Sequence, residues 1–203
     1  FHQSDLAWQG VTCHDQHAVV GGGVFNDGGT VELFNSTFSQ NVAETAGGGI
    51  FNEATGQVEL LFVTLHENPA GFGGSFFNNE GTFTVKNSLL SNTRSGGNCS
   101  LGIRSLGHNL SSDTSCIGSL VEGSDLNNVD PLLDPAGLKA NGGPTLTVAL
   151  LAGSPAIDAV PESACTDGEG DPIRSDQRGI LRPIGSGCDI GAYEAQGGGG
   201  NEG

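Results

Sequence analysis

A short glycine-rich motif recurs three times along this chain and constrains its fold more than any other feature. The copies read GGGVFN, GGGIFN and GGSFFN and occupy residues 21–26, 47–52 and 73–78, a spacing of 26 residues. A run of alternating apolar and polar residues follows each copy, which is typical of a β-strand with one buried face. A supersecondary unit repeated at this period predicts a solenoid.

The apolar residues that follow each motif keep their register from copy to copy. Successive copies of one position lie 27 and then 25 residues apart, so the residue gained in one turn is lost in the next. We expect equivalent side chains to stack as ladders inside the solenoid. The predicted inward ladders are Val31/Val58/Phe83, Leu33/Leu60/Val85 and Phe38/Leu65/Leu90.

The repeat length favours an all-β, right-handed, single-stranded parallel β-helix. Helix-pair repeats are longer and need an apolar period of 3.6 residues, and the leucine-rich consensus is absent. Glycine suits the corners of such coils, where a Cβ is excluded. Two further ladders are expected from the motif itself: Asn26, Asn52 and Asn78, with their amides bonded to one another and to the turns, and Phe25, Phe51 and Phe77.

The register divides the chain into segments. Regular coils are expected over residues 21–93 and irregular coils over 94–160, so that the β-helix spans 21–160. Residues 161–194 are expected to form a disulfide-pinned cap, and residues 195–203 a flexible glycine-rich tail. Residues 1–20 form either an irregular first coil or an extension that adds a strand to a neighbouring subunit.

Composition restricts the class of partner. The chain of 203 residues has 23 acidic and seven basic residues, a net charge of −16, which disfavours nucleic acid and anionic membranes. No apolar run is long enough to cross a bilayer. Because the chain begins at Phe1 and contains no Met, we expect a mature form of an exported protein.

The five cysteines agree with export. Cys99 and Cys116 flank one short loop, Cys165 and Cys188 flank another, and no C-x-x-C pair of a zinc ribbon occurs. Two local disulfides, Cys99–Cys116 and Cys165–Cys188, formed in an oxidising compartment, are the simplest interpretation. Cys13 is either a free buried thiol or a partner in a bond between subunits.

The C-terminal half contains specific motifs, and together with the glycine-asparagine coils it resembles a known family. These motifs are GHNL (107–110), DP (130–131), NGGPT (141–145), GSPAID (153–158), DQRG (176–179), RP (182–183) and CDIGAYE (188–194). Over residues 21–194 the chain resembles the choice-of-anchor Q domains of secreted bacterial β-helix proteins, which are related to the polymorphic outer-membrane protein repeats. The resemblance implies an exported, often surface-attached β-helix and no known enzyme activity.

Charged residues within these motifs suggest how the cap is held. Arg178 and Arg182 lie among the acidic residues Asp176, Asp189 and Glu194. Bidentate arginine–carboxylate bonds would pin the last loop across the end of the coil. We therefore predict a structural role for these residues.

Two further sets of residues are candidate sites. Asp167, Glu169 and Asp171 alternate on a glycine-flexed turn and suggest calcium, although the turn lacks the EF-hand pattern and an exposed acidic turn explains it better. No other cofactor is expected. Three positions match the N-glycosylation pattern: Asn35, Asn98 and Asn109.

Three function classes compete. We expect an extracellular, non-catalytic structural protein that assembles with itself, end to end, into a surface fibre or filament. The alternatives are a cell-surface adhesin that binds carbohydrate and a polysaccharide lyase or glycosidase. An enzyme would need paired carboxylates, for which the register offers Glu32 and Glu59, but the regular coils contain too few basic residues to hold an acidic sugar.

Overall fold

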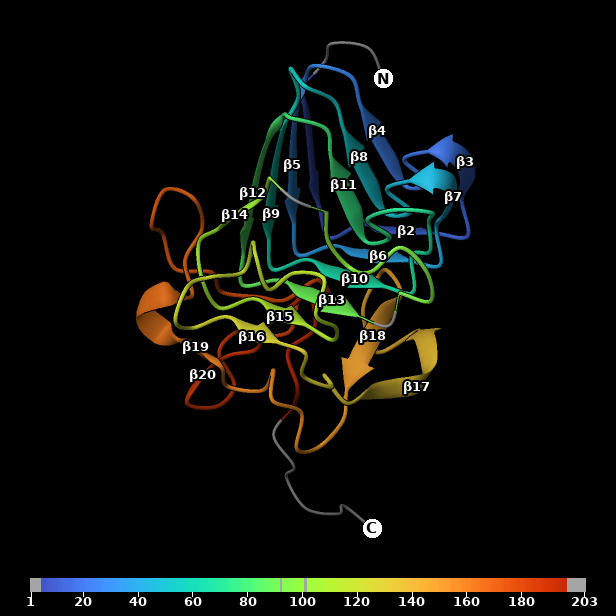
Figure 1. Cartoon of the computed structure of the whole chain (residues 1–203). Coiled ribbons are helices and arrows are strands. Elements are labelled where there is room, and N and C mark those ends of the chain that lie inside the picture. Colours follow the sequence, from blue (N-terminus) through green and yellow to red (C-terminus); the bar gives the residue numbers. More distant parts are fainter. Residues whose placement is uncertain (1–4, 92, 101, 197–203) are drawn as a thin grey trace.

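The computed structural model describes residues 5–91, 93–100 and 102–196. Over these residues the chain is all-β apart from one short 3-10 helix, η1 (Glu162–Ala164). Parallel strands from successive turns of the chain stack into a β-solenoid of about four turns (Figure 1). The predicted parallel β-helix is therefore confirmed. The predicted tail lies outside the described residues from residue 197 onward.

Two large parallel sheets form two faces of the solenoid. The first sheet has the strand order β1 (Leu6–Gln9), β5 (Thr30–Phe34), β9 (Gln57–Leu61), β12 (Thr82–Lys86) and β14 (Arg104–Ser105). The second sheet has the order β2 (Thr12–His14), β6 (Thr37–Ser39), β10 (Thr64–His66), β13 (Leu89–Ser91), β15 (Leu110–Ser111) and β16 (Leu126–Asn127).

Smaller parallel sheets complete each coil. A third sheet contains β4 (Val24–Asn26), β8 (Ile50–Asn52) and β11 (Phe76–Asn78), and β3 (His17–Val20) pairs with β7 (Val42–Ala46). Strands β1 to β4 thus form the first coil and β5 to β8 the second. Residues 5–20 belong to this first coil and lie alongside the second.

The strand register follows the sequence period. Val31 is paired with Val58 and Val58 with Phe83, so the gain and loss of one residue between copies leaves the ladder intact. Phe38, Leu65 and Leu90 form an equivalent ladder in the second sheet, and the core side chains at these positions are almost fully buried. They belong to one apolar cluster inside the solenoid, which we call the inner core.

Glycine is required where the motif turns the corner into the third sheet. Gly21 and Gly73 have φ of +61° and +51°, and a Cβ on either would lie 2.5 Å from the backbone carbonyl oxygen three residues ahead. Atoms do not approach so closely, so any other residue would force the corner apart. The repeated glycines are thus explained by the geometry of the turn.

The part of the C-terminal half that lies beyond β16 does not continue the solenoid. Its two antiparallel pairs join β17 (Leu133–Lys139) to β18 (Thr147–Leu150) and β19 (Val160–Pro161) to β20 (Gly187–Cys188). Figure 1 shows these orange and red segments below β6, β10 and β13, against the outer surface of the second sheet. The expectation of a cap across the end of the coil is therefore wrong, because this segment runs along the side.

Three hydrogen bonds trace that side-on path across successive coils. They join Asn35 Nδ2 to Ser175 O (2.8 Å), Ala192 N to Thr64 Oγ1 (2.9 Å) and Asn87 Nδ2 to Ala164 O (3.0 Å). Between the two halves lies a second apolar cluster, the outer core. It combines Leu61, Phe62, Leu89 and Leu110 of the solenoid with Leu150, Ala156, Val160, Cys165, Ile173, Cys188 and Ile190.

Candidate functional site

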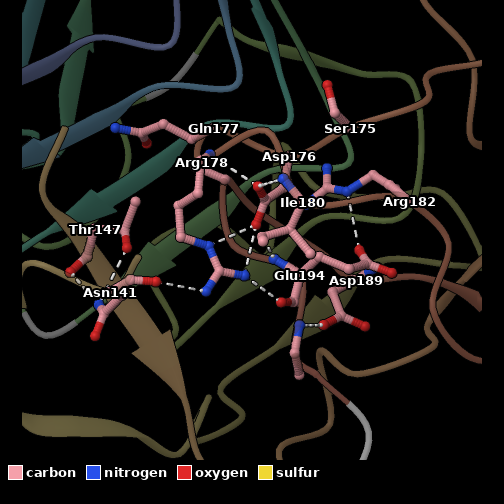
Figure 2. Close-up of polar contacts among 12 residues, drawn as sticks. Asn141, Thr147, Ser175, Asp176, Gln177, Arg178, Ile180, Arg182, Asp189 and Glu194 are labelled. Atoms are coloured by element: carbon pink, nitrogen blue, oxygen red, sulfur yellow. Dashed lines mark hydrogen bonds and ion pairs between the residues drawn. The ribbon is translucent and has the colours of Figure 1, made fainter. Parts of the chain in front are cut away.

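Arg178 is at the centre of the predicted arginine cluster (Figure 2). Its guanidinium donates to Asp176 through Nε (2.8 Å) and NH2 (2.7 Å), and through NH1 to the carbonyl oxygen of Asn141 (3.1 Å). The Cζ atom of the guanidinium lies 3.7 Å from the centre of the Tyr193 ring. Because the side chains of Arg178 and Asp176 are both at most 2% exposed, this ion pair is closed to solvent.

Arg182 forms the second buried ion pair, but its partner is Glu194. Their Nε and Oε2 atoms are 2.9 Å apart, and the guanidinium also lies 4.4 Å from the ring centre of Phe62 in the solenoid. Burial lowers the pKa of Arg182, an effect that the neighbouring carboxylates oppose, Glu194 the most. Arg182 therefore connects Phe62 of the outer core to Glu194, close to the C-terminal end of the described residues.

Asp189 has a different role from the one predicted. Its carboxylate accepts hydrogen bonds from the backbone N–H groups of Asp158 and Ala195. Burial raises the pKa of Asp189 to about 6, although these hydrogen bonds act in the opposite direction. The correction is that Glu194 supplies the second ion-pair partner, whereas Asp189 fastens backbone segments.

Gln177 connects this cluster to the first coil, although it was not among the predicted site residues. Its Nε2 donates to Thr12 Oγ1 (3.0 Å), and its Oε1 accepts from Thr37 Oγ1 (2.6 Å). These partners lie 165 and 140 residues away in the chain. No local pattern signals such a contact. The whole arginine cluster thus holds two halves of the molecule together and exposes no group for chemistry.

The asparagine and phenylalanine ladders both form. Asn26 Nδ2 donates to Asn52 Oδ1 (2.8 Å), and Asn52 Nδ2 donates to Asn78 Oδ1 (2.9 Å), while each amide also bonds to a turn carbonyl. The rings of Phe25, Phe51 and Phe77 follow one another at centroid distances of 5.6 and 5.3 Å. Both ladders run parallel to the solenoid axis and tie successive coils together.

The first coil forms an open end of the solenoid. Within the described residues, β1, β2, β3 and β4 each have a strand neighbour on one side only. Leu6, Trp8 and Cys13 are half-buried side chains that pack against the inner core at this end. Strand edges without a neighbouring strand, beside partly exposed core residues, form a surface suited to further strands.

At the opposite end of the solenoid the strands β11, β14 and β16 also have one strand neighbour each within the described residues, but a turn covers the inner core there. The disulfide Cys99–Cys116 draws the turn that contains Cys116 and Leu120 into the inner core, where these two side chains are 0% and 2% exposed. Backbone N–H groups of Ser119 and Leu120 bond to Cys116 O, both at 2.8 Å, and close the turn on itself. The two ends of the solenoid therefore differ in kind.

Both predicted disulfides are confirmed, the second being Cys165–Cys188 in the outer core. Cys13 is a free, half-buried thiol on β2. Its Sγ lies 3.7 Å from Asn41 Oδ1, and burial raises its pKa. A bond from Cys13 to a second subunit stays a prediction.

The acidic turn faces a groove beside the first sheet. Asp167, Glu169, Glu32 and Glu59 line this cavity of about 460 Å³. Asp167 Oδ1, however, accepts the backbone N–H groups of Glu169 (2.9 Å) and Asp171 (2.8 Å), so it shapes the turn. Among the described residues no three His, Cys, Asp or Glu side chains are grouped as metal ligands. The calcium site stays a prediction.

Glu32 and Glu59, the candidate carboxylates of an enzyme, lie side by side on β5 and β9. Lys86 on β12 is a cation near these carboxylates, and its Nζ donates to Thr166 O and Oγ1, both at 3.1 Å. Burial lowers the pKa of Lys86, while Asp167 and Glu59 oppose the shift. The lysine is thus occupied in fastening the acidic turn to the solenoid.

The structure argues against the three predicted glycosylation sites. These asparagines are at most 2% exposed. Their Nδ2 atoms donate to backbone carbonyl oxygens, those of Ser175, Leu90 and Val85 for Asn35, Asn98 and Asn109 respectively. A glycan on the amide nitrogen would displace these buried bonds, so the folded chain has no room for one.

Comparisons of the chain with protein-family models, curated proteins and solved structures found no match. The resemblance to the choice-of-anchor Q domains therefore stays a prediction. Over the described residues, no helix has the length and apolar character needed to cross a bilayer. The two disulfides are compatible with an extracellular protein.

Proposed function

We propose that this chain is an extracellular, non-catalytic structural protein that associates with a second copy of itself through its first coil. The observation that carries the proposal is the difference between the two ends of the solenoid. At one end four edge strands lie beside half-buried core residues, whereas at the other end a disulfide-linked turn covers the inner core. An unpaired row of N–H and C=O groups is a template for strands of another chain.

The first coil also lacks the usual protection of an edge. Lys, Arg and Pro, which prevent edge pairing in other proteins, do not occur between Asp5 and Asn26. One irregularity, a shift of register between Ala18 and Val20, interrupts the pairing of β3 with β7. Strands β1, β2 and β4 have no such feature within the described residues, so they supply the pairing surface.

A second copy is the partner that this surface fits. Because the inner core is covered at the far end, two copies meet open end to open end, with β2 antiparallel to β2 of the partner. Such contact is isologous and forms a closed two-fold dimer, whereas the expected filament would also need an open far end. Secretion is supported by the two disulfides, which persist in oxidising compartments.

Light scattering coupled to size exclusion, over a wide range of protein concentrations, tests this proposal. We expect a dimer for the unchanged chain and a monomer for the pair Ala7→Lys and His14→Lys, which places charges on β1 and β2. Thr55→Lys, on the exposed turn that follows β8 in the second coil and outside the edge strands, is the matched control and should remain dimeric. A monomer at every concentration would refute self-association. Open-ended polymers would refute the closed dimer alone.

A further inference from the structure

A long groove lies beside the second sheet, separate from the open first coil. It is a cavity of about 1010 Å³ between the corner that follows β6 and β10 and the strand β17. Ligand pockets are commonly about 300–1,000 Å³, so this groove is large enough for an extended ligand. Its wall on the solenoid side comes from successive coils, through Gln40, Glu67 and Arg94.

The charges on this wall already neutralise one another. Glu67 Oε1 lies 3.2 Å from Arg94 NH2, and Glu67 Oε2 accepts from Gln40 Nε2 at the same distance. On the opposite wall Asp134 is paired with Lys139 at 3.0 Å. Asn128 and Asp130 add an amide and a carboxylate at exposed positions. The groove therefore offers both hydrogen-bond donors and acceptors, and most of its charges already have a partner of opposite sign.

Apolar side chains stand beside these polar groups. Leu132 and Leu151 line the groove and are 38% and 42% exposed, and the Leu151 N–H donates to Leu132 O at 2.8 Å. Leu132 has φ of +48°, a left-handed conformation that is strained for a bulky residue. Strained conformations that keep a side chain in place are concentrated at binding sites. The strain at Leu132 holds an exposed apolar side chain at the groove.

We propose that this groove binds an uncharged, polyhydroxylated chain, that is, a neutral oligosaccharide. Each sugar hydroxyl both donates and accepts hydrogen bonds, and so it matches neighbouring guanidinium, amide and carboxylate groups. The C–H faces of the sugar rings pack on Leu132 and Leu151. The net charge of −16 repels acidic glycans. This ligand class goes beyond self-association and does not depend on it.

Titration calorimetry with hexasaccharides of β-1,4-glucan, chitin and mannan tests the proposal. We expect at least one of them to bind, with an affinity that changes less than about twofold between low and high salt, because no net charge is neutralised. Arg94→Gln and Asp130→Asn should each weaken binding about tenfold, as loss of one hydrogen bond to a charged group does. Glu44→Gln, on the exposed face of β7, is the matched control and should bind like the unchanged protein.

Leu132→Gly separates a binding role from a purely structural one. Glycine adopts positive φ without strain, so this variant should melt at a higher temperature and yet bind the hexasaccharide more weakly. Lower thermal stability with unchanged binding would show that Leu132 serves only the fold. The proposal is overturned if none of the hexasaccharides binds at millimolar concentration, if binding ignores all three substitutions, or if only basic peptides bind and salt abolishes that binding.

Discussion

The two halves of this molecule bury their apolar side chains in different ways. In the middle coils of the solenoid, inward residues lie between equivalent residues of the neighbouring coils, as Leu65 lies between Phe38 and Leu90. In the C-terminal half the outer core has no repeat, and buried ion pairs such as Arg182 with Glu194 lie beside it. The solenoid is therefore held by many equivalent contacts, and the C-terminal half by a few specific ones.

This difference determines which substitutions should destabilise each half. A ladder distributes stability over equal steps, since each coil contacts only its neighbours. A buried ion pair concentrates it, because removing one partner leaves the other charge buried without compensation. Substitutions in the two halves should consequently differ in both size and pattern.

The largest loss of stability is expected from Arg182→Met, which removes one partner of a buried ion pair in the C-terminal half. Glu194, 1% exposed, would remain buried without its cation, so the free energy of unfolding should fall by about 3–5 kcal/mol. Urea denaturation followed by circular dichroism measures it. Arg94→Met is the control, because the Arg94 side chain is 76% exposed and its ion pair should contribute about 0–1 kcal/mol. Equal losses in both variants would contradict the comparison.

Leu65→Ala tests the inner core. Its side chain is fully buried between rigid ladder neighbours, and the resulting cavity should lower the free energy of unfolding by about 3 kcal/mol. Ile173→Ala, in the outer core, should cost less, because irregular loops relax into a cavity more readily than stacked strands do. A larger loss at Ile173 would reverse the assignment of rigid and adaptable halves.

Asn52→Ala tests a single step of the asparagine ladder. The change removes an acceptor from Asn26 and a donor from Asn78, which should cost about 1–3 kcal/mol. Asn79→Ala, whose bond to Glu53 is exposed, should change stability by less than about 0.5 kcal/mol. Thermal melts of both variants measure the difference, and similar melting temperatures would show that the ladder adds little.

Asp189 predicts a pH dependence that belongs to the C-terminal half. The folded chain retains the Asp189 proton up to about pH 6, whereas an unfolded aspartate loses it near pH 4. Between these values the folded state binds more protons, so the contribution of Asp189 to stability is greatest at low pH and is lost as the pH rises. The urea midpoint of the unchanged chain should therefore fall more steeply than that of Asp189→Asn across this window. If the urea midpoints of the two proteins changed equally with pH, Asp189 would not be the cause of the pH dependence.

The solenoid was predictable because its contacts lie one period away. The positions of Val31, Val58 and Phe83 in the sequence already contain their pairing, and the ladder at Asn26, Asn52 and Asn78 follows from the same register. The disulfide pairs were predictable for a related reason, since each closes a short loop.

The path of the C-terminal half was not predictable. The motif around Arg178 and Arg182 indicates that charges pair, but it does not indicate which surface they cover. One signal was present in the sequence: residues 60–63 read LLFV, an unbroken apolar run where the strand pattern should alternate. Leu61 and Phe62 in that run face outward and form the floor of the outer core.

The side-on path of the C-terminal half also fixes the number of coils. This segment forms hydrogen bonds to four consecutive coils, from Thr12 to Asn87, through Gln177, Ser175, Ala192 and Ala164. Duplication of one coil would lengthen the stack by about 4.8 Å and move the hydrogen-bonding groups of every later coil out of reach of this segment. The length of the segment thus matches the length of a stack with this number of coils. A repeat that could otherwise grow by duplication is kept at one length.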